Sequence, residues 1–223
     1  GHKKIGKCPV AIQSFSGTYK ARIMKKTPQH FKRENVKKLF DKVLGDSKVK
    51  LAPLSINIFE SFKDDFTTVD LTYTETCQQS TKVCSLAEVK AKGFVDCLFV
   101  GLHDEYIKTY SSLEKIKLVN IEVKPLMKKS TERGSDARTS VAIKVEVKDH
   151  GISEFENESR SMIHSSFVSS LEAFQFYINC EKTFKKIKSF LEDAQSRNRG
   201  DIIQSCLTDL STLTEVNTYA KGE

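Results

Sequence analysis

Two strands and a helix can be read in residues 67–106, whose sequence is TTVDLTYTETCQQSTKVCSLAEVKAKGFVDCLFVGLHDEY. Apolar and polar residues alternate at 67–73 and again at 83–89, which is the period of a strand with one buried face. The short polar turn between these two runs is typical of a hairpin. From Gly93 onward the apolar residues recur at helical spacing instead. The segment therefore predicts an antiparallel hairpin followed by a helix.

The same order of elements occurs twice in the chain. A third alternating run, at 54–58, precedes the hairpin, so residues 51–110 spell three strands and a helix. Residues 117–180 repeat this order, with a long helical pattern at the end. The alternating runs of the second copy are residues 119–123, 139–147 and 152–159. One helix does not cover a sheet fully, so the exposed surface favours pairing of the two units and then of two chains.

Helices are predicted on both sides of the duplicated region. Thr27-Pro28 is a typical helix start, and Gly45 is a typical helix end. Two further helices are predicted at about 182–195 and 201–215. We therefore expect an α+β fold of duplicated βββα units with antiparallel sheets, an extra N-terminal helix and two C-terminal helices. The predicted divisions are a basic, linker-like segment with one helix at 1–50, a duplicated βββα domain at 51–180, and a helical extension at 181–223.

The composition is that of a folded, basic protein. The 223 residues carry a formal charge of +7, from 36 Lys and Arg against 29 Asp and Glu. Most of the positive excess lies in the first 50 residues, where it can attract nucleic acid or an anionic surface. The chain has no Trp, and few aromatic residues lie among these lysines. A solvated lysine-rich face is therefore the preferred interpretation, which argues against nucleic acid as a partner. No run approaches the roughly 20 uninterrupted apolar residues of a membrane span, so no membrane partner is expected.

No catalytic or cofactor motif is present in the sequence. It has no C-x-x-C pair, no glycine-rich phosphate loop, no G-x-S-x-G and no H-x-H pair. We expect neither a metal nor a cofactor, and we expect the chain itself to be non-catalytic, although it can belong to a larger enzyme. Six cysteines without metal-ligand spacing favour reduced thiols in an intracellular, cytoplasmic protein, with an organelle left open.

Three short motifs lie in register with the repeat. They are GFVDC at 93–97, GSDA at 134–137 and SMIHSS at 161–166. The first and third open the two predicted helices, and the second precedes the strand at 139–147. These motifs resemble the G-P-V-D-A, G-x-D-A and D-I-I-x-A-S motifs in the C-terminal regulatory domain of the 2-isopropylmalate synthase and citramalate synthase family. The resemblance covers about residues 50–180.

The resemblance implies a non-catalytic regulatory, allosteric domain that forms a homodimer and binds a branched-chain amino acid, leucine or isoleucine, as feedback effector. In that family the domain follows an acyl-CoA-condensing catalytic barrel and regulates biosynthesis such as that of leucine, so an upstream catalytic domain is implied too. Amide groups at helix starts can hold the effector's carboxylate, and an Asp can hold its ammonium group. By matching position, the effector-binding residues are Gly93, Val95, Asp96, Gly134, Asp136, Ala137, Ile163 and Ser166.

The chain departs from the family pattern at two helix starts. Phe94 stands where the family has Pro, and Ser161 stands where it has Asp. The bulk of the first and the lost charge of the second both bear on the effector pocket. The first alternative is therefore a ligand-free dimeric interaction scaffold on the same fold, and the second is a basic nucleic-acid-binding protein. Only an effector-binding domain should gain thermal stability from an amino acid.

Overall fold

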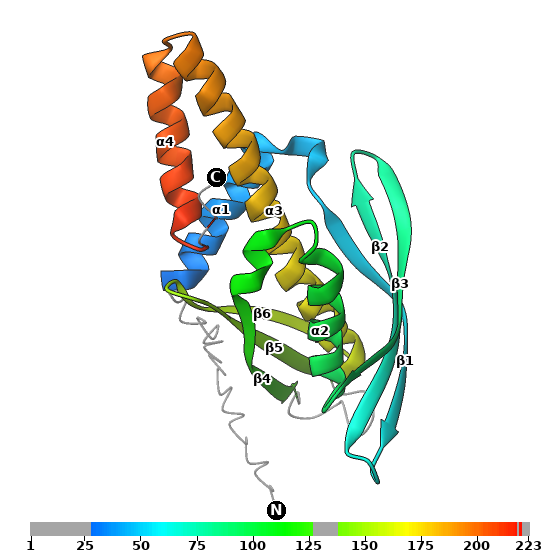
Figure 1. Cartoon of the computed structure of the whole chain (residues 1–223). Helices are drawn as coiled ribbons and strands as arrows, with labels where there is room; N and C mark the ends of the chain where they lie inside the picture. Colours follow the sequence, from blue (N-terminus) through cyan, green and yellow to red (C-terminus); the bar gives the residue numbers. More distant parts are fainter. Residues whose placement is uncertain (1–27, 127–137, 218, 220–223) are drawn as a thin grey trace, which may run out of the picture.

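The computed structural model describes residues 28–126, 138–217 and 219 of the chain. Two three-stranded antiparallel sheets are separated by helices, and a helical hairpin extends beyond them (Figure 1). Each sheet is followed by a helix, so the predicted α+β fold of duplicated βββα units is confirmed.

The first sheet is a meander with its second strand in the centre. Its strands are β1 (Lys50–Ser61), β2 (Phe66–Cys77) and β3 (Ser80–Ala91). The turn between β2 and β3 consists of Gln78 and Gln79, with φ values of 50° and 63°. Positive φ at both positions is typical of a type I′ hairpin, whose twist matches that of the paired strands.

The helix α2 (Phe94–Tyr106) covers the inner face of this sheet and packs on β2 and β3. The helix and β3 approach closely, because a Cβ atom at Gly101 would lie 3.0 Å from Cγ2 of Val89. The central strand contributes Val69 and Leu71, which are fully buried. The alternation in the sequence thus corresponds to the face that α2 covers.

The second unit repeats this arrangement. After the short helix η2 (Ser111–Lys115), its strands are β4 (Ile116–Leu126), β5 (Arg138–Val147) and β6 (Gly151–Ser159). The strand β5 is central, and all its pairs are antiparallel. The buried residues on the inner face of β5 are Val141, Ile143 and Val145.

The helix of the second unit is longer than the sequence predicted. The sequence predicts one helix to about residue 180 and another at 182–195. Instead α3 (Met162–Ser196) is continuous and is followed by α4 (Gly200–Thr214), with which it forms a hairpin. The predicted break is wrong, because no Gly or Pro interrupts α3 and its buried face continues to residues such as Ile187.

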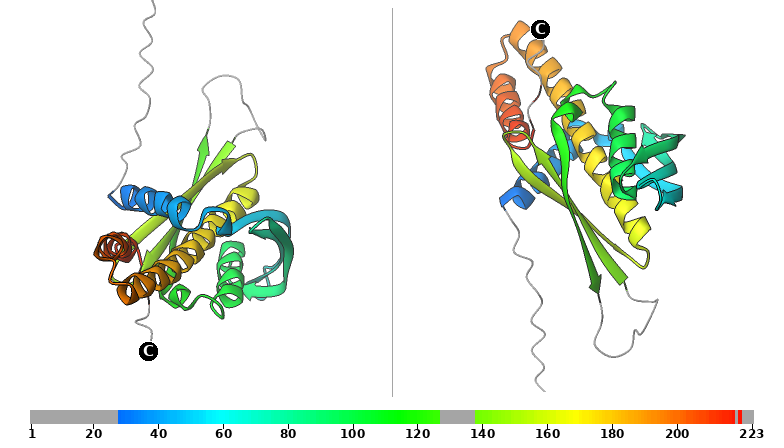
Figure 2. Two further views of the ribbon diagram at one scale, coloured as in Figure 1. Left: turned by 90° about the horizontal axis from the view of Figure 1, so that it is seen from above. Right: turned by 60° about the horizontal axis from the view of Figure 1, so that its bottom comes forward.

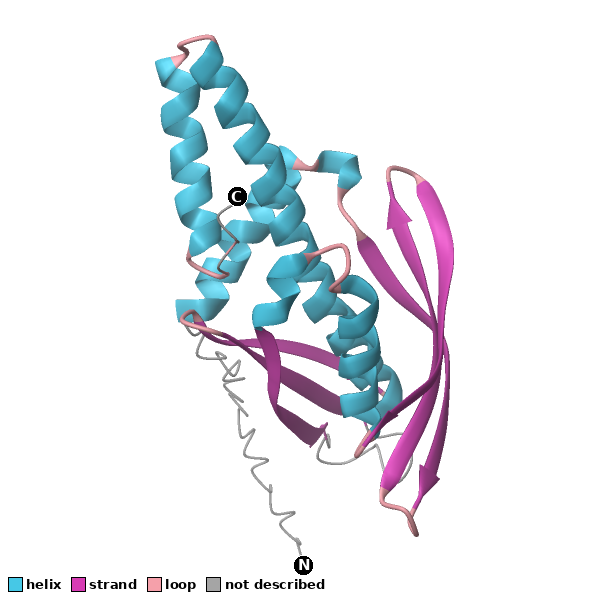
Figure 3. Cartoon of the chain, in the orientation of Figure 1, coloured by secondary structure: helices cyan, strands magenta, loops and turns pink. Residues whose placement is uncertain are grey.

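Helices α2 and α3 lie between the two sheets (Figure 3). They meet at Phe99 and Phe174, whose ring centroids are 5.0 Å apart. Further along the chain, in η2, the backbone N–H of Ser112 donates to Oε2 of Glu181 on α3 at 2.9 Å. The contacts advance in the same direction along both segments, so the two helices run parallel.

The helix α1 (Pro28–Val43) lies across the second unit, where it contacts α3, α4 and β6 (Figure 2). Its buried residues, Val36, Leu39 and Phe40, join the same hydrophobic core as the two sheets. Nε2 of Gln29 donates to the carbonyl of His150 at 2.9 Å, which fixes α1 to the turn between β5 and β6. The short helix η1 (Gly45–Ser47) then leads into β1.

Candidate functional site

The starts of α2 and α3 lie at the same end of the molecule, as Figure 1 shows for the two parallel helices. At α3, the Ser161 hydroxyl caps the helix by accepting a hydrogen bond from the backbone N–H of His164 at 3.2 Å. At α2, the preceding residue is Gly93, and it makes no side-chain cap. The first amide groups of α2 therefore lack a side-chain acceptor at this position and suit an anionic ligand better than those of α3.

The structure places five of the eight predicted effector-binding residues at this end. These are Gly93, Val95, Asp96, Ile163 and Ser166. Asp96 and Ile163 are exposed, whereas Val95 and Ser166 are buried in the protein interior. The Ser166 hydroxyl also donates to the carbonyl of Met162 at 2.8 Å. The other three, Gly134, Asp136 and Ala137, lie outside the described residues.

Exposed apolar side chains lie at the same end. Val123 on β4, Met162 and Ile163 are 46%, 42% and 38% exposed. Val123 pairs with Val141 on β5, and the carbonyl of Val141 accepts a hydrogen bond from the Ser169 hydroxyl of α3 at 3.2 Å. Strand β4 thus brings Val123 toward the start of α3. This end of the second unit therefore combines exposed apolar surface with the start of a helix.

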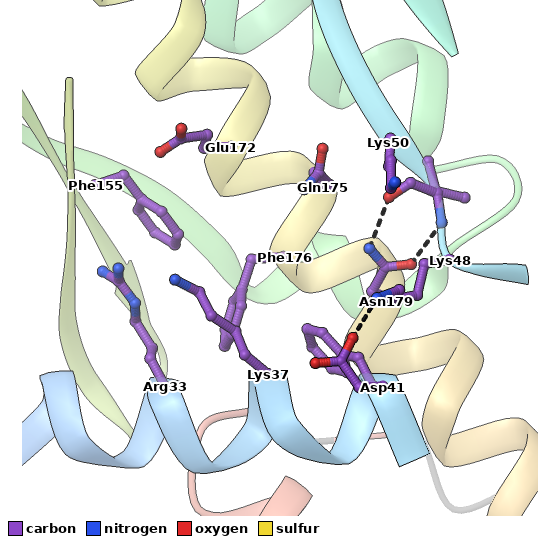
Figure 4. A pocket seen from close by; sticks show the side chains of 12 residues that line it. Arg33, Lys37, Asp41, Lys48, Lys50, Phe155, Glu172, Gln175, Phe176 and Asn179 are labelled. Atoms are coloured by element: carbon purple, nitrogen blue, oxygen red, sulfur yellow. Dashed lines mark hydrogen bonds and ion pairs between the residues drawn. The ribbon is translucent and has the colours of Figure 1, made fainter. Parts of the chain in front are cut away.

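The structure also contains a cavity that the sequence pattern does not predict. It lies between α1, the start of β1, β6 and the middle of α3, and has a volume of about 340 Å³ (Figure 4). This size suits a small molecule. Three phenylalanine rings contribute to its lining, from Phe40, Phe155 and Phe176. The charged residues in the lining are Arg33, Lys37, Asp41, Lys48, Lys50 and Glu172.

Arg33 is held firmly in the wall of this cavity. Its guanidinium carbon lies 4.3 Å from the ring centroid of Phe155, and its Nη1 donates to the carbonyl of Glu154. Its Nε is buried and has no hydrogen-bond partner among the described residues. Burial lowers the pKa of Arg33 from its usual value, although nearby Tyr177 and glutamates oppose the shift. The guanidinium remains charged, so the cavity holds a positive group with a free donor.

Two amide side chains fix the opposite wall. Asn179 accepts a hydrogen bond from the N–H of Val49 and donates one to its carbonyl, both at 2.8 Å. Oε1 of Gln175 accepts from the N–H of Leu51, also at 2.8 Å. These bonds join the start of β1 to α3, so the wall is built from side chains with defined positions.

The remaining charges around the cavity only partly compensate one another. Lys37 pairs with Glu34 at 3.0 Å, and Lys48 pairs with Asp41. Burial raises the pKa of Glu172, and the positive charges of Lys37 and Arg33 oppose that shift. The lining has four basic side chains and two carboxylates, so positive charge prevails.

The spacing of residues on α3 is a signal that could have indicated this wall. Glu172, Gln175, Phe176 and Asn179 lie three, four and seven residues apart, which places them on one face of a helix. The apolar spacing of the predicted helix indicates its buried face, but it assigns no role to this second, mostly polar face. The partner residues on α1 could not be found in this way, because the contact joins segments far apart in the sequence.

Within the described parts of the chain, no group of three or more His, Cys, Asp or Glu side chains is placed to hold a metal ion. The cysteines in these parts are Cys77, Cys84, Cys97, Cys180 and Cys206, all of them free thiols. Among the helices described, none has both the length and the apolar character needed to cross a membrane.

No model of a known protein family matches the sequence, and no curated protein matches it significantly. Inferences about function therefore depend on the three motifs, the duplicated fold and the geometry described above.

Proposed function

We propose that the chain is a non-catalytic regulatory and dimerisation domain, similar to that of the 2-isopropylmalate synthase family. Its ligand in this proposal is leucine or isoleucine, bound where α2 and α3 begin. The observation that supports the proposal is the duplicated βββα fold, whose two parallel helices start at the same end. Two of the three motifs that carry the resemblance open these helices.

The chemistry of this end suits an α-amino acid. The uncapped amide groups at the start of α2 can receive the carboxylate, and the exposed carboxylate of Asp96 can receive the ammonium group. The aliphatic side chain would lie against exposed apolar residues such as Val123 and Ile163. Leucine and isoleucine would then be preferred over smaller amino acids by about 1–3 kcal/mol per methylene group.

The same exposed apolar residues support a homodimer. A second copy of the chain would remove Val123, Met162 and Ile163 from water and would close the ligand site from the other side. An effector at such an interface changes the activity of a linked catalytic domain if it binds two states of the dimer with different affinity. Catalysis itself would belong to that linked domain.

One observation favours a second candidate, a dimeric scaffold that has no ligand. Val95 and Ser166 are 5% and 1% exposed, so two of the expected contact residues offer an effector little or no side-chain surface. Phe94 adds a bulky ring at the same helix start. A scaffold of this kind would form the dimer and show no response to amino acids.

A thermal-shift scan against the twenty amino acids, with the mass measured by light scattering, tests the proposal. At ten times its dissociation constant, a ligand specific for the folded state adds about 1.4 kcal/mol, which corresponds to roughly 3–6 °C for a chain of this size. We expect leucine or isoleucine to produce this shift in a dimer. A dimer without any shift would favour the scaffold, and a monomer without any shift would contradict both candidates.

A pair of matched variants tests the site itself. Asp96→Asn should abolish the shift, because it removes the negative charge expected to hold the ammonium group. Asp104→Asn makes the same change of charge at an exposed position near the other end of α2 and should keep the shift. A full amino-acid response in Asp96→Asn would show that the site is assigned wrongly.

A further inference from the structure

The cavity beside α1 has a charge that its own side chains do not balance. Arg33 is stacked on Phe155 with a buried Nε that no described residue accepts from. A buried cationic donor without an acceptor costs free energy, and a bound anion would remove that cost. The neighbouring side chain of Lys37 comes from the next turn of α1 and points the same way, toward Phe155 and Glu172 (Figure 4).

We propose that this cavity is a binding site for a small organic carboxylate with an apolar body. The carboxylate lies between Arg33, whose guanidinium can donate a charge-assisted hydrogen bond to it, and Lys37, whose ammonium group it would share with Glu34. The apolar body lies against the rings of Phe155 and Phe176, whose centroids are 5.9 Å apart. The hydrogen bonds of Asn179 hold the opposite wall in place, so the site is formed before the ligand binds.

The acidic side chains of the cavity determine which anions fit. Glu172 lies across from Arg33 and Lys37 in Figure 4, and Asp41 belongs to the same lining. The negative charge of these two carboxylates disfavours a doubly charged phosphate more than a singly charged carboxylate. The three phenylalanine rings add apolar surface that inorganic anions do not use. Both features favour a monovalent organic acid.

This site is separate from the effector site proposed at the helix starts. The residues of α3 that line the cavity begin at Glu172, ten positions after the first residue of the helix, Met162. At 1.5 Å per residue this is about 15 Å along the helix axis. A ligand in the cavity would bridge α1, β6 and α3, three elements that lie far apart in the sequence.

Titrations followed by ¹H–¹⁵N NMR can observe the unpaired donor directly, through the Nε–H signal of Arg33. The signal is assigned from its absence in Arg33→Lys. The probes are acetate, isovalerate and benzoate, with benzamide as the uncharged analogue of benzoate and inorganic phosphate as the inorganic anion. We expect isovalerate or benzoate to shift the signal with saturation and to bind more tightly than acetate, and we expect benzamide to leave it unchanged. The proposal is overturned if no carboxylate shifts the signal, if benzamide shifts it equally, or if phosphate binds as tightly as the best carboxylate.

Variants that keep Arg33 in place make the test independent of folding. Lys37→Gln should weaken carboxylate binding about tenfold, because it removes a charged donor at the surface of α1. Lys38→Gln changes the net charge equally on the adjacent, exposed position and should change the affinity by less than about twofold. Equal effects of these two variants would mean that only the general positive charge of α1 attracts the probes.

Glu172→Gln tests the selectivity in the opposite direction. Removal of this carboxylate should strengthen phosphate binding relative to benzoate, and an unchanged ratio would contradict the role of Glu172. Asp96→Asn should leave the benzoate titration unchanged, since Asp96 lies in the first turn of α2 and does not line the cavity. Loss of benzoate binding in Asp96→Asn would contradict the assignment of the carboxylate to this cavity.

Discussion

The two βββα units have the same strand order and parallel helices, but they differ in what packs around them. The helix of the first unit, α2, has 13 residues. The helix of the second unit, α3, has 35 residues, continues beyond its sheet, and packs against both α1 and α4. The cavity lined by Arg33 and Glu172 exists because of this difference. Repetition of a fold unit therefore does not by itself locate a pocket; here the pocket depends on an element outside the repeat.

The outer faces of the two sheets differ as well. On the first sheet, hydroxyl groups pair across strands, as between Thr76 and Thr81 at 2.9 Å. On the second sheet, Glu122 lies between two lysines, Lys124 at 2.8 Å and Lys144. The hydroxyl pair on the first sheet does not titrate near neutral pH, whereas the cluster around Glu122 on the second carries charges that respond to pH and salt.

The contact between the two units should be the most sensitive part of the molecule. Phe174 is fully buried on α3 and meets Phe99 of α2. Phe174→Ala should lower the free energy of unfolding by about 3–5 kcal/mol, because it leaves a cavity at the contact between the units. Chemical denaturation measures this loss.

Phe190→Ala is the matched control for this change. Phe190 lies on the same helix beyond both sheets and is 48% exposed, so its loss should cost much less. Equal costs for the two variants would show that α3 is stabilised along its length and not at the contact with α2.

The two helix starts should respond differently to substitution. Ser161→Ala removes the cap of α3 and should cost about 1 kcal/mol. Gly93→Ser gives α2 a capping side chain and should gain a few tenths of a kcal/mol, since Gly93 has an extended backbone that any residue adopts. Thermal unfolding of both variants checks the pair. A stabilising effect of Ser161→Ala would mean that the cap contributes nothing, and the exposed Ser189→Ala on α3 controls for helix propensity.

The strands and most helices could be predicted because their signals are local. The alternation at 139–147 and the change of period at Gly93 each depend on neighbouring residues, and both are confirmed. The helical spacing after Gly93 also predicts the apolar face of α2, to which the buried Val95 belongs. The burial of Ser166 could not be predicted, because the rotation of α3 depends on its packing against the other unit. The cavity was missed for a related reason: Arg33 and Phe155 are 122 positions apart in the numbering and meet only when α1 packs across β6.

The smallest expected effect concerns the charged outer face of the second sheet. Hydrogen bonds from Lys124 and Lys144, together with their positive charge, lower the pKa of Glu122 from 4.5 to about 2. A pKa that is lower in the folded state favours folding while the group is ionised, so this contribution is complete above about pH 4.5 and is lost as the pH falls toward 2.

Glu122→Gln should therefore remove part of the loss of stability between these pH values, as measured by denaturation at several pH values in low salt. Thr76→Ala on the outer face of the first sheet should leave the pH dependence unchanged, because no titrating group is removed. If Glu122→Gln has the same pH profile as the unmodified chain, the lysines bind this carboxylate no better in the folded state than water does, and the difference between the two outer faces has no energetic consequence.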